Sequence, residues 1–157
     1  MSGSSQRTSV SYYDVSLEPV EKSADISSLW RELETRAHPS FFLSWVWISN
    51  WLEVYKPEVL LAKVSHDEKI VAVALITQRQ ARRHSLVPVT TLHFHETGDP
   101  LKDQIWSEYN GVLFDAEHPE SVVALVNHLS NRIEKWDELD FGVVEKGSIL
   151  SLIHISE

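Results

Sequence analysis

The chain has 157 residues, a length that suits one domain and rarely holds two. Hydrophobic residues make up 43% of it and charged residues 24%, with six Trp, so a real hydrophobic core can form and a disordered or collagen-like chain is excluded. Its 14 basic and 23 acidic residues give a formal charge of −9, which argues against nucleic-acid binding, because a protein that binds phosphates normally carries a basic face.

The predicted elements begin near residue 12. Residues 1–11 are polar and rich in serine, and we expect a disordered leader there rather than a signal peptide. Tyr12–Leu17 has the composition of a strand. We expect one domain to extend from this strand to residue 149.

Two amphipathic helices are predicted next. Between Ser23 and His38 the apolar residues recur at helical spacing, and Ser23 or Asp25 can cap the first turn. A second helix is predicted from about Ser40 to Pro57. Its apolar face comprises Phe41, Trp45, Ile48, Leu52 and Tyr55, widened by Trp47, Trp51 and Val54. The aromatic residues of both helices could form a stacking surface for sugars or bases, but their helical spacing favours packing in the core.

The pattern then changes to the period of strands. Val59–Ser65 and Ile70–Ile76 are predicted to form a hairpin. Further elements are predicted as strands at Val87–His95, Tyr109–Phe114 and Leu139–Val144 and as a helix at Ser121–Trp136. This order predicts an α/β fold with a mixed, mainly antiparallel sheet flanked by helices.

The last eight residues do not resemble a protein segment. Residues 150–157 read LSLIHISE, which matches, in one frame, the translation of a transposase adapter used in shotgun sequencing. We therefore expect a non-native tail from residue 150 and a natural gene product that is longer than this chain. A genuine apolar strand is the alternative that the composition permits.

His93 and His95 lie two residues apart on a predicted strand, so both are expected to project from one face. Glu96 and Asp99 follow, and imidazoles beside a carboxylate are a possible half-site for zinc. A third ligand at a defined spacing is missing. Alternating polar residues on one face of a sheet give the same pattern, and because we favour that interpretation, no metal site is predicted.

Arg79, Arg82 and Arg83 form the basic cluster of the sequence. Guanidinium groups could clamp a phosphate or carboxylate there. Charged residues at the end of a strand more often stay solvated and protect an edge of the sheet. We favour this second interpretation.

Conventional signals of catalysis and of membranes are absent from the sequence. It contains no Gly-rich phosphate loop, no nucleophile elbow and no cysteine. The lack of cysteine excludes disulfides and thiolate metal sites and suits a cytoplasmic protein. No run of about 18 apolar residues occurs, so no transmembrane segment is predicted.

Trp106 lies in a predicted loop beside Glu108, Tyr109 and Asn110. Aromatic and polar residues that gather on a loop are better candidates for a site than aromatic residues of the core. The alternative is that Asn110 and Gly111 simply form a turn into the next strand. Both interpretations stay open.

Two segments carry a resemblance to a known family. The first is FF-x-SW-x-W-x3-W at Phe41–Trp51. The second is ETGDP at Glu96–Pro100, followed by Asp103 and by EYNG at Glu108–Gly111. In this order they resemble the N-terminal half of a GNAT-superfamily acyltransferase of the Fem-like group, in particular the acetyltransferases associated with cellulose or exopolysaccharide biosynthesis. The resemblance covers residues 12–149.

The resemblance implies two tandem GNAT-like halves, with the donor chemistry and most site residues in the later half. The full-length protein would use acetyl-CoA or another acyl-CoA to acylate an amine or hydroxyl of a small molecule or glycan. This half would be inactive alone and would have the missing C-terminal half as its partner. Glu108, Tyr109 and Asn110 are expected to contact the acceptor or that half, with Trp106 beside them, and no catalytic base is assigned.

Two other classes of protein compete with an acyltransferase domain. A non-catalytic module could bind a glycan or an anionic ligand through the loop Trp106–Asn110 and the arginine cluster. A small metal-dependent enzyme could use His93 and His95. We rank the acyltransferase domain first and the metal-dependent enzyme last.

Overall fold

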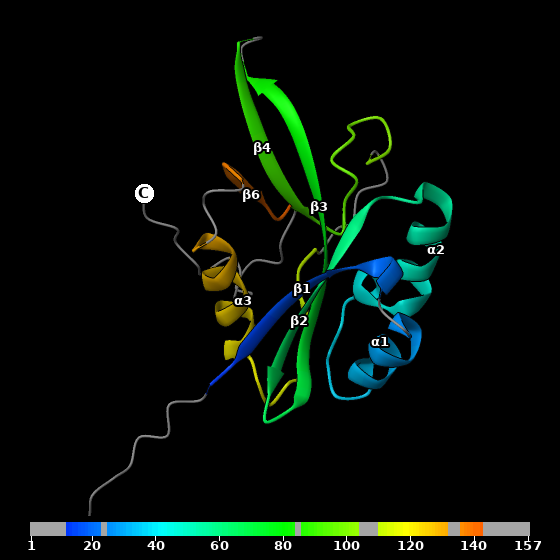
Figure 1. The fold of residues 1–157 in the computed structure, drawn as a ribbon. Helices are drawn as coiled ribbons and strands as arrows, with labels where there is room; N and C mark the ends of the chain where they lie inside the picture. The colour runs from blue at the N-terminus through cyan, green and yellow to red at the C-terminus, as the bar shows by residue number, and fades with distance from the viewer. Residues whose placement is uncertain (1–11, 23–24, 84–85, 104–109, 132–135, 143–157) are drawn as a thin grey trace, which may run out of the picture.

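The computed structural model describes residues 12–22, 25–83, 86–103, 110–131 and 136–142. Within them the chain forms a sheet with helices on both faces (Figure 1). Its helices are α1 (Ile26–Glu34), α2 (Trp45–Tyr55) and α3 (Glu120–Ser130). Its strands are β1 (Asp14–Pro19), β2 (Val59–His66), β3 (Lys69–Arg83), β4 (Val87–Phe94), β5 (Leu113–Phe114) and β6 (Glu138–Asp140). Short 3-10 turns at Val20–Lys22 and Phe41–Leu43 precede α1 and α2.

The sheet has the order β1-β2-β3-β4-β6, and β5 pairs with β3. All of these pairs are antiparallel except β4–β6, which is parallel. A parallel pair needs a crossover connection, and α3 lies within the connection between β4 and β6. The predicted α/β fold with a mixed, mainly antiparallel sheet is therefore confirmed.

The two faces of the sheet form separate cores because neighbouring residues of a strand point to opposite sides. On β3, Val73 and Leu75 pack toward α1 and α2, whereas Ala72, Ala74 and Ile76 belong to the core beneath α3. Every one of these side chains is almost fully buried. A strand that is buried on both faces reads as a continuous apolar run, as the sequence of β3 does here.

Side-chain hydrogen bonds fix the N-terminal ends of α1 and α2. The Asp25 carboxylate accepts from the Ser28 N–H at 2.9 Å and caps α1, as predicted. The α2 helix begins later than predicted, at Trp45, because a 3-10 turn precedes it and Ser44 caps it by accepting from the Trp47 N–H. The Trp30 indole Nε1 donates to the Leu43 carbonyl at 2.8 Å and joins α1 to that turn.

Several predicted boundaries and faces were wrong. The strand predicted at Ile70–Ile76 continues to Arg83, so the arginine cluster lies on β3. The strand predicted at Tyr109–Phe114 is confined to Leu113–Phe114 within the described residues. On α2 the buried residues are Ile48 and Trp51, while Phe41 and Val54, which were predicted to join the apolar face, are 62% and 70% exposed.

The predicted leader (1–11) and the predicted tail (150–157) lie outside the described residues. The same holds for the last part of the expected domain, at 143–149. In the described part of the chain, no helix is long and apolar enough to cross a membrane.

Candidate binding pocket

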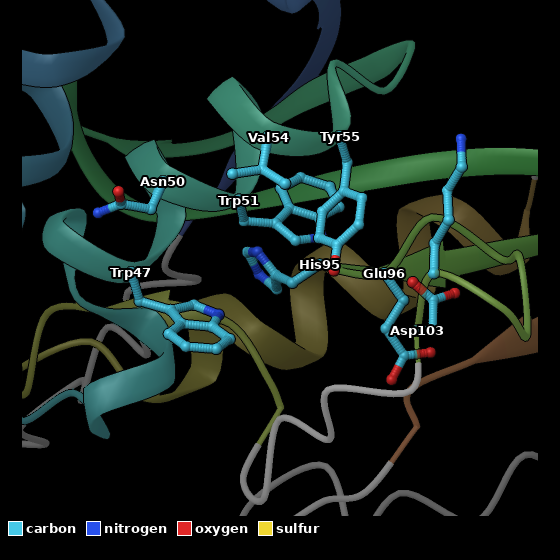
Figure 2. A pocket seen from close by; sticks show the side chains of 9 residues that line it. Trp47, Asn50, Trp51, Val54, Tyr55, His95, Glu96 and Asp103 are labelled. Atoms are coloured by element: carbon cyan, nitrogen blue, oxygen red, sulfur yellow. The ribbon is translucent and has the colours of Figure 1, made fainter.

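A pocket of about 170 Å3 opens between α2 and the loop that follows β4. Figure 2 shows the aromatic residues of α2 near His95, with Glu96 and Asp103 on the other side. The lining residues are Trp47, Asn50, Trp51, Val54, Tyr55, His95, Glu96, Lys102 and Asp103. We call this cavity the α2 pocket.

One stripe of the α2 helix forms the first wall of the α2 pocket. Trp47, Trp51 and Tyr55 follow one another at intervals of four residues, which places them on one side of the helix. Trp51 is 7% exposed and anchors this wall in the core. Phe41 and Phe42 support Trp47 from outside, with ring centroids 5.7 and 5.0 Å from its own.

The second wall is the loop of residues 95–103, which hydrogen bonds attach to β3. The His95 N–H donates to the Leu75 carbonyl at 2.9 Å, and the Thr77 hydroxyl donates to the Glu96 carbonyl at 2.6 Å. Further along, the Thr97 N–H and hydroxyl both donate to Asp103 Oδ1 at 2.8 Å. These bonds hold the loop in a defined shape and present its acidic side chains to the cavity.

His95 is the most deeply buried polar residue of the α2 pocket, at 4% exposed. Its ring packs edge-on against Trp30, with ring centroids 5.8 Å apart. Burial lowers the pKa of His95 to about 4, against a smaller opposing effect of the Gly111 backbone. The imidazole is therefore neutral at pH 7, and neither ring nitrogen makes a well-formed hydrogen bond to a described residue.

Glu96 is a half-buried carboxylate of the α2 pocket that lies near other acidic groups. Burial and the nearby carboxylates of Asp140 and Asp103 raise the pKa of Glu96 to about 7. The raised pKa means that the surroundings of Glu96 disfavour a negative charge on this carboxylate. A ligand that brought a positive charge or hydrogen-bond donors would relieve this repulsion.

The lining of the α2 pocket combines two kinds of recognition. The aromatic stripe offers flat apolar surface, while Glu96, Asp103, Asn50 and Lys102 offer polar atoms. A small number of polar groups set in a mainly aromatic wall is typical of a binding site for a small organic molecule. The arrangement suits a ligand with an apolar face and several hydroxyl or amino groups.

The structure does not place His93 and His95 on one face, as the strand pattern predicted. His95 follows the last residue of β4 and has a φ of 51°, so the alternation of side chains is interrupted there. His95 consequently faces Trp30 and the α2 pocket. His93 instead lies near Asp140, whose Oδ2 is 3.4 Å from His93 Nδ1.

The arginine cluster does not form one clamp. Arg79 and Arg82 differ in position by an odd number of residues on β3, so they point to opposite faces of the sheet. Arg79 Nη1 lies 3.8 Å from Asp99 Oδ2, and Arg82 is exposed. This arrangement favours the solvated-edge interpretation for these two residues.

Of the four residues predicted to contact the acceptor or the second half, only Asn110 falls within the described part of the chain. It is 6% exposed; its side-chain amide donates to the Phe94 carbonyl, and its Oδ1 accepts from the Gly111 N–H at 2.9 Å. These contacts fit the turn interpretation, and Asn110 does not line the α2 pocket. Trp106, Glu108 and Tyr109 lie outside the described residues.

Sequence reasoning considered Trp47 and Trp51 as part of a stacking surface but favoured packing in the core, because their spacing is helical, and it placed Tyr55 only on the apolar face of the helix. The same spacing could have shown that a single stripe extends beyond the buried residues. Only the fold, however, shows that the loop after β4 faces this stripe. The signal in the sequence was therefore real but incomplete.

No protein-family model matches the chain, and neither the curated proteins nor the solved structures give a match. The functional proposal therefore rests on the sequence resemblance together with the α2 pocket.

Proposed function

We propose that this chain is the acceptor-binding half of an acyl-CoA-dependent acyltransferase of the GNAT type. In this proposal the α2 pocket holds a small molecule or glycan unit that presents an amine or hydroxyl. A second GNAT-like half holds acetyl-CoA or another acyl-CoA. The protein acts in the cytoplasm, which the lack of cysteine favours.

The observation that carries the proposal is where two segments of the sequence meet. The FF-x-SW-x-W-x3-W segment and the ETGDP…D segment are the parts that resemble the Fem-like acyltransferases. They are separated by more than 40 residues in the sequence, yet Trp47 and Trp51 from the first line the same pocket as Glu96 and Asp103 from the second. A shared pocket is what the proposal expects if both segments bind the acceptor.

The chemistry of acyl transfer explains what such a pocket would contribute. The acceptor nitrogen or oxygen forms a bond to the acyl carbon, the thioester C–S bond breaks, and the acceptor's proton leaves as CoA thiol is released. Holding the acceptor at a fixed position makes this reaction effectively intramolecular, which is a large part of enzymatic rate enhancement. The aromatic wall would orient the acceptor, and the polar atoms of the 95–103 loop would bind its hydroxyl or amino groups.

A non-catalytic glycan-binding module is the second candidate. It is favoured by the combination of aromatic rings and carboxylates in the α2 pocket, which serves sugar binding equally well without any transfer step. The two candidates differ in one respect. The acyltransferase requires turnover of acyl-CoA by the full-length protein, whereas the module binds without turnover.

Isothermal titration calorimetry with glucosamine tests the binding step, because this probe carries both hydroxyls and an amine. We expect one binding site in the chain and a loss of affinity in Trp47→Ala. The matched control is Trp136→Phe, which changes an indole on the α3 side that donates to the Leu129 carbonyl. Equal glucosamine affinities of Trp47→Ala and Trp136→Phe would contradict the acceptor role of the α2 pocket. The absence of glucosamine binding to the unaltered chain would contradict it as well.

A test of transfer follows from the same probe. Release of free thiol from acetyl-CoA in the presence of glucosamine, assayed with the complete gene product, is expected for the acyltransferase. Binding of glucosamine without thiol release would instead support the glycan-binding module.

A further inference from the structure

Next to the α2 pocket, three potential metal ligands from separate segments come together. They are His93 on β4, Glu96 in the following loop and Asp140 at the end of β6. One ligand atom from each lies within 4.8 Å of the other two. Ligand atoms bound at about 2.0–2.2 Å from one zinc ion lie within roughly 4 Å of each other, so small side-chain rotations would bring these three groups to a single ion.

The topology of the sheet brings His93 and Asp140 together. In the parallel pair of β4 and β6, His93 is in register with Asp140. Registered neighbours on adjacent strands project on the same face, so imidazole and carboxylate lie side by side. His93 Nδ1 and Asp140 Oδ2 are 3.4 Å apart.

The turn at His95 brings Glu96 to the same place. In a regular strand, positions 93 and 96 would point to opposite faces. The positive φ of His95 interrupts this alternation, and Glu96 joins His93 instead. The same backbone turn that separates His95 from His93 therefore places Glu96 beside His93.

Two glycines leave room around this set. A Cβ atom on Gly98 would lie 2.9 Å from His93 Nε2, and one on Gly142 would lie 2.4 Å from Glu96 Oε1. Both glycines also have positive φ, of 71° and 60°. Larger residues at these positions would therefore press on the side chains of His93 and Glu96.

The charges of the set are unbalanced. Within the described part of the chain, neither Glu96 nor Asp140 has an Arg or Lys partner within ion-pair distance. His93 Nδ1 is buried and has no hydrogen-bond partner among the described residues. Two neighbouring carboxylates, one of them 3.4 Å from a buried imidazole nitrogen that makes no well-formed hydrogen bond, are complementary to a cation.

We propose that His93, Glu96 and Asp140 bind a divalent transition-metal ion, with zinc as the ion to test. One imidazole and two carboxylates are a donor set that zinc accepts, and three protein ligands leave a position for water or substrate. The metal proposal does not depend on the proposed acyltransferase role, although the two sites share Glu96. Glu96 also lines the α2 pocket, and since a carboxylate has two oxygens, it can face both the ion and a ligand in the pocket.

The test is titration of the metal-free chain with zinc chloride, followed by isothermal calorimetry and by elemental analysis after dialysis. We expect one zinc ion per chain. In His93→Ala, Glu96→Gln and Asp140→Asn we expect the affinity to fall at least about tenfold, since even groups that only support a ligand contribute about 10- to 100-fold. Magnesium chloride is the comparison ion, and we expect it to bind more weakly because it prefers an all-oxygen octahedral site.

Asp99→Asn is the matched control. It removes a nearby carboxylate that pairs with Arg79 and is not among the three ligands. We expect this variant to bind zinc like the unaltered chain, which separates ligation from a general change of charge. The thermal melting of each metal-free variant identifies any that does not fold, and the isosteric Glu96→Gln and Asp140→Asn then decide.

Two results would overturn the proposal. The first is that no zinc stays bound to the unaltered chain after dialysis. The second is that zinc stays bound with unchanged affinity in folded Glu96→Gln and Asp140→Asn, which would assign it to another part of the chain. Neither result bears on glucosamine binding, so the metal site and the acceptor role can fail separately.

Discussion

The two faces of the sheet are covered by different kinds of side chain, and only one of them borders the α2 pocket. Beneath α3 the core consists mainly of Ala, Val, Leu and Ile side chains that are almost fully buried. Beneath α1 and α2 the core contains Trp30 and Trp51, and the same aromatic surface continues outward into the α2 pocket. The face of the sheet beneath α3 is fully covered by packed side chains. The face beneath α1 and α2, which we call the front face, is packed in the same way but also borders a cavity.

This difference would let one helix, α2, contribute both to stability and to the proposed binding. Aliphatic side chains of the α3 face fit closely and leave little polar surface. The wide rings of α2 reach past the edge of the core, so Trp51 is buried while Trp47 and Tyr55 stay partly accessible. We therefore expect substitutions on the α3 face to change stability alone, and those in the α2 pocket to change binding.

The largest effect is expected on the α3 face, from Leu125→Ala. Leu125 is fully buried, and its truncation leaves a cavity, so the free energy of unfolding should fall by about 2–5 kcal/mol. Urea denaturation measures this change, with Val123→Ala, at an exposed position of the same helix, as the control. Glucosamine affinity of the folded variant should stay the same; a changed affinity would show that the two faces are not independent.

A second substitution breaks the link between the two faces. Arg36, after α1, pairs with the buried Asp115 that precedes α3, and the Ala116 N–H donates to the Arg36 carbonyl at 2.9 Å. Hydrogen bonds to charged groups contribute about 1.5–3 kcal/mol, so Asp115→Asn should lower the free energy of unfolding by about that amount at pH 7. Urea denaturation at pH 7 checks the value.

The same carboxylate predicts a dependence of stability on pH. Burial raises the pKa of Asp115, but the Glu117 N–H and the Arg36 guanidinium, with Lys69, lower it by more. The folded pKa is thus below the unfolded value of about 3.9, so this contribution to stability is present above that pH and is lost as the pH falls through the folded pKa. Asp115→Asn should weaken the loss of stability in acid, and an unchanged acid profile would contradict this account.

A smaller effect is expected from Trp47→Ala in the α2 pocket. An aromatic contact contributes about 0.5–1.5 kcal/mol beyond burial, so glucosamine affinity should fall by about 2- to 12-fold. The free energy of unfolding should change less than in Leu125→Ala, because Trp47 is only half-buried. A stability loss as large as that of Leu125→Ala would show that Trp47 belongs to the core rather than to the binding wall.

The smallest effect is expected from Val54→Ser at the rim of the α2 pocket. Val54 is 70% exposed, and surface substitutions of this kind usually change the free energy of unfolding by at most about 0.5 kcal/mol. Thermal and urea denaturation should therefore resemble those of the unaltered chain. A clear destabilisation would place Val54 in the packed part of the front face.

Much of this fold was predictable because the spacing of apolar residues along the chain indicates whether a segment is a helix or a strand. The short apolar runs of β2 and β3 and the helical spacing in α1 and α3 predicted the element types and the mixed sheet. The prediction from this spacing was wrong at His95, where the backbone departs from the strand conformation. The positive φ of His95 separates it from His93, and no residue type in that stretch announces such a turn.

The candidate sites were less predictable than the fold, because they depend on long-range pairing. Nothing local indicates that Asp140 lies in register with His93, since β6 reaches β4 only after the α3 crossover. The α2 pocket likewise needs a helix and a loop that are far apart in the sequence. The sequence shows that Trp47 is an aromatic residue suited to stacking, but only the fold shows which residues it faces across the pocket.

The central claim is that the α2 pocket binds the acceptor. Nuclear magnetic resonance of the 15N-labelled chain during titration with glucosamine tests it most directly. We predict that shift changes among the described residues concentrate in Trp47–Tyr55 and in residues 95–103. Shift changes that concentrate in α3, or no change at all, would contradict the claim.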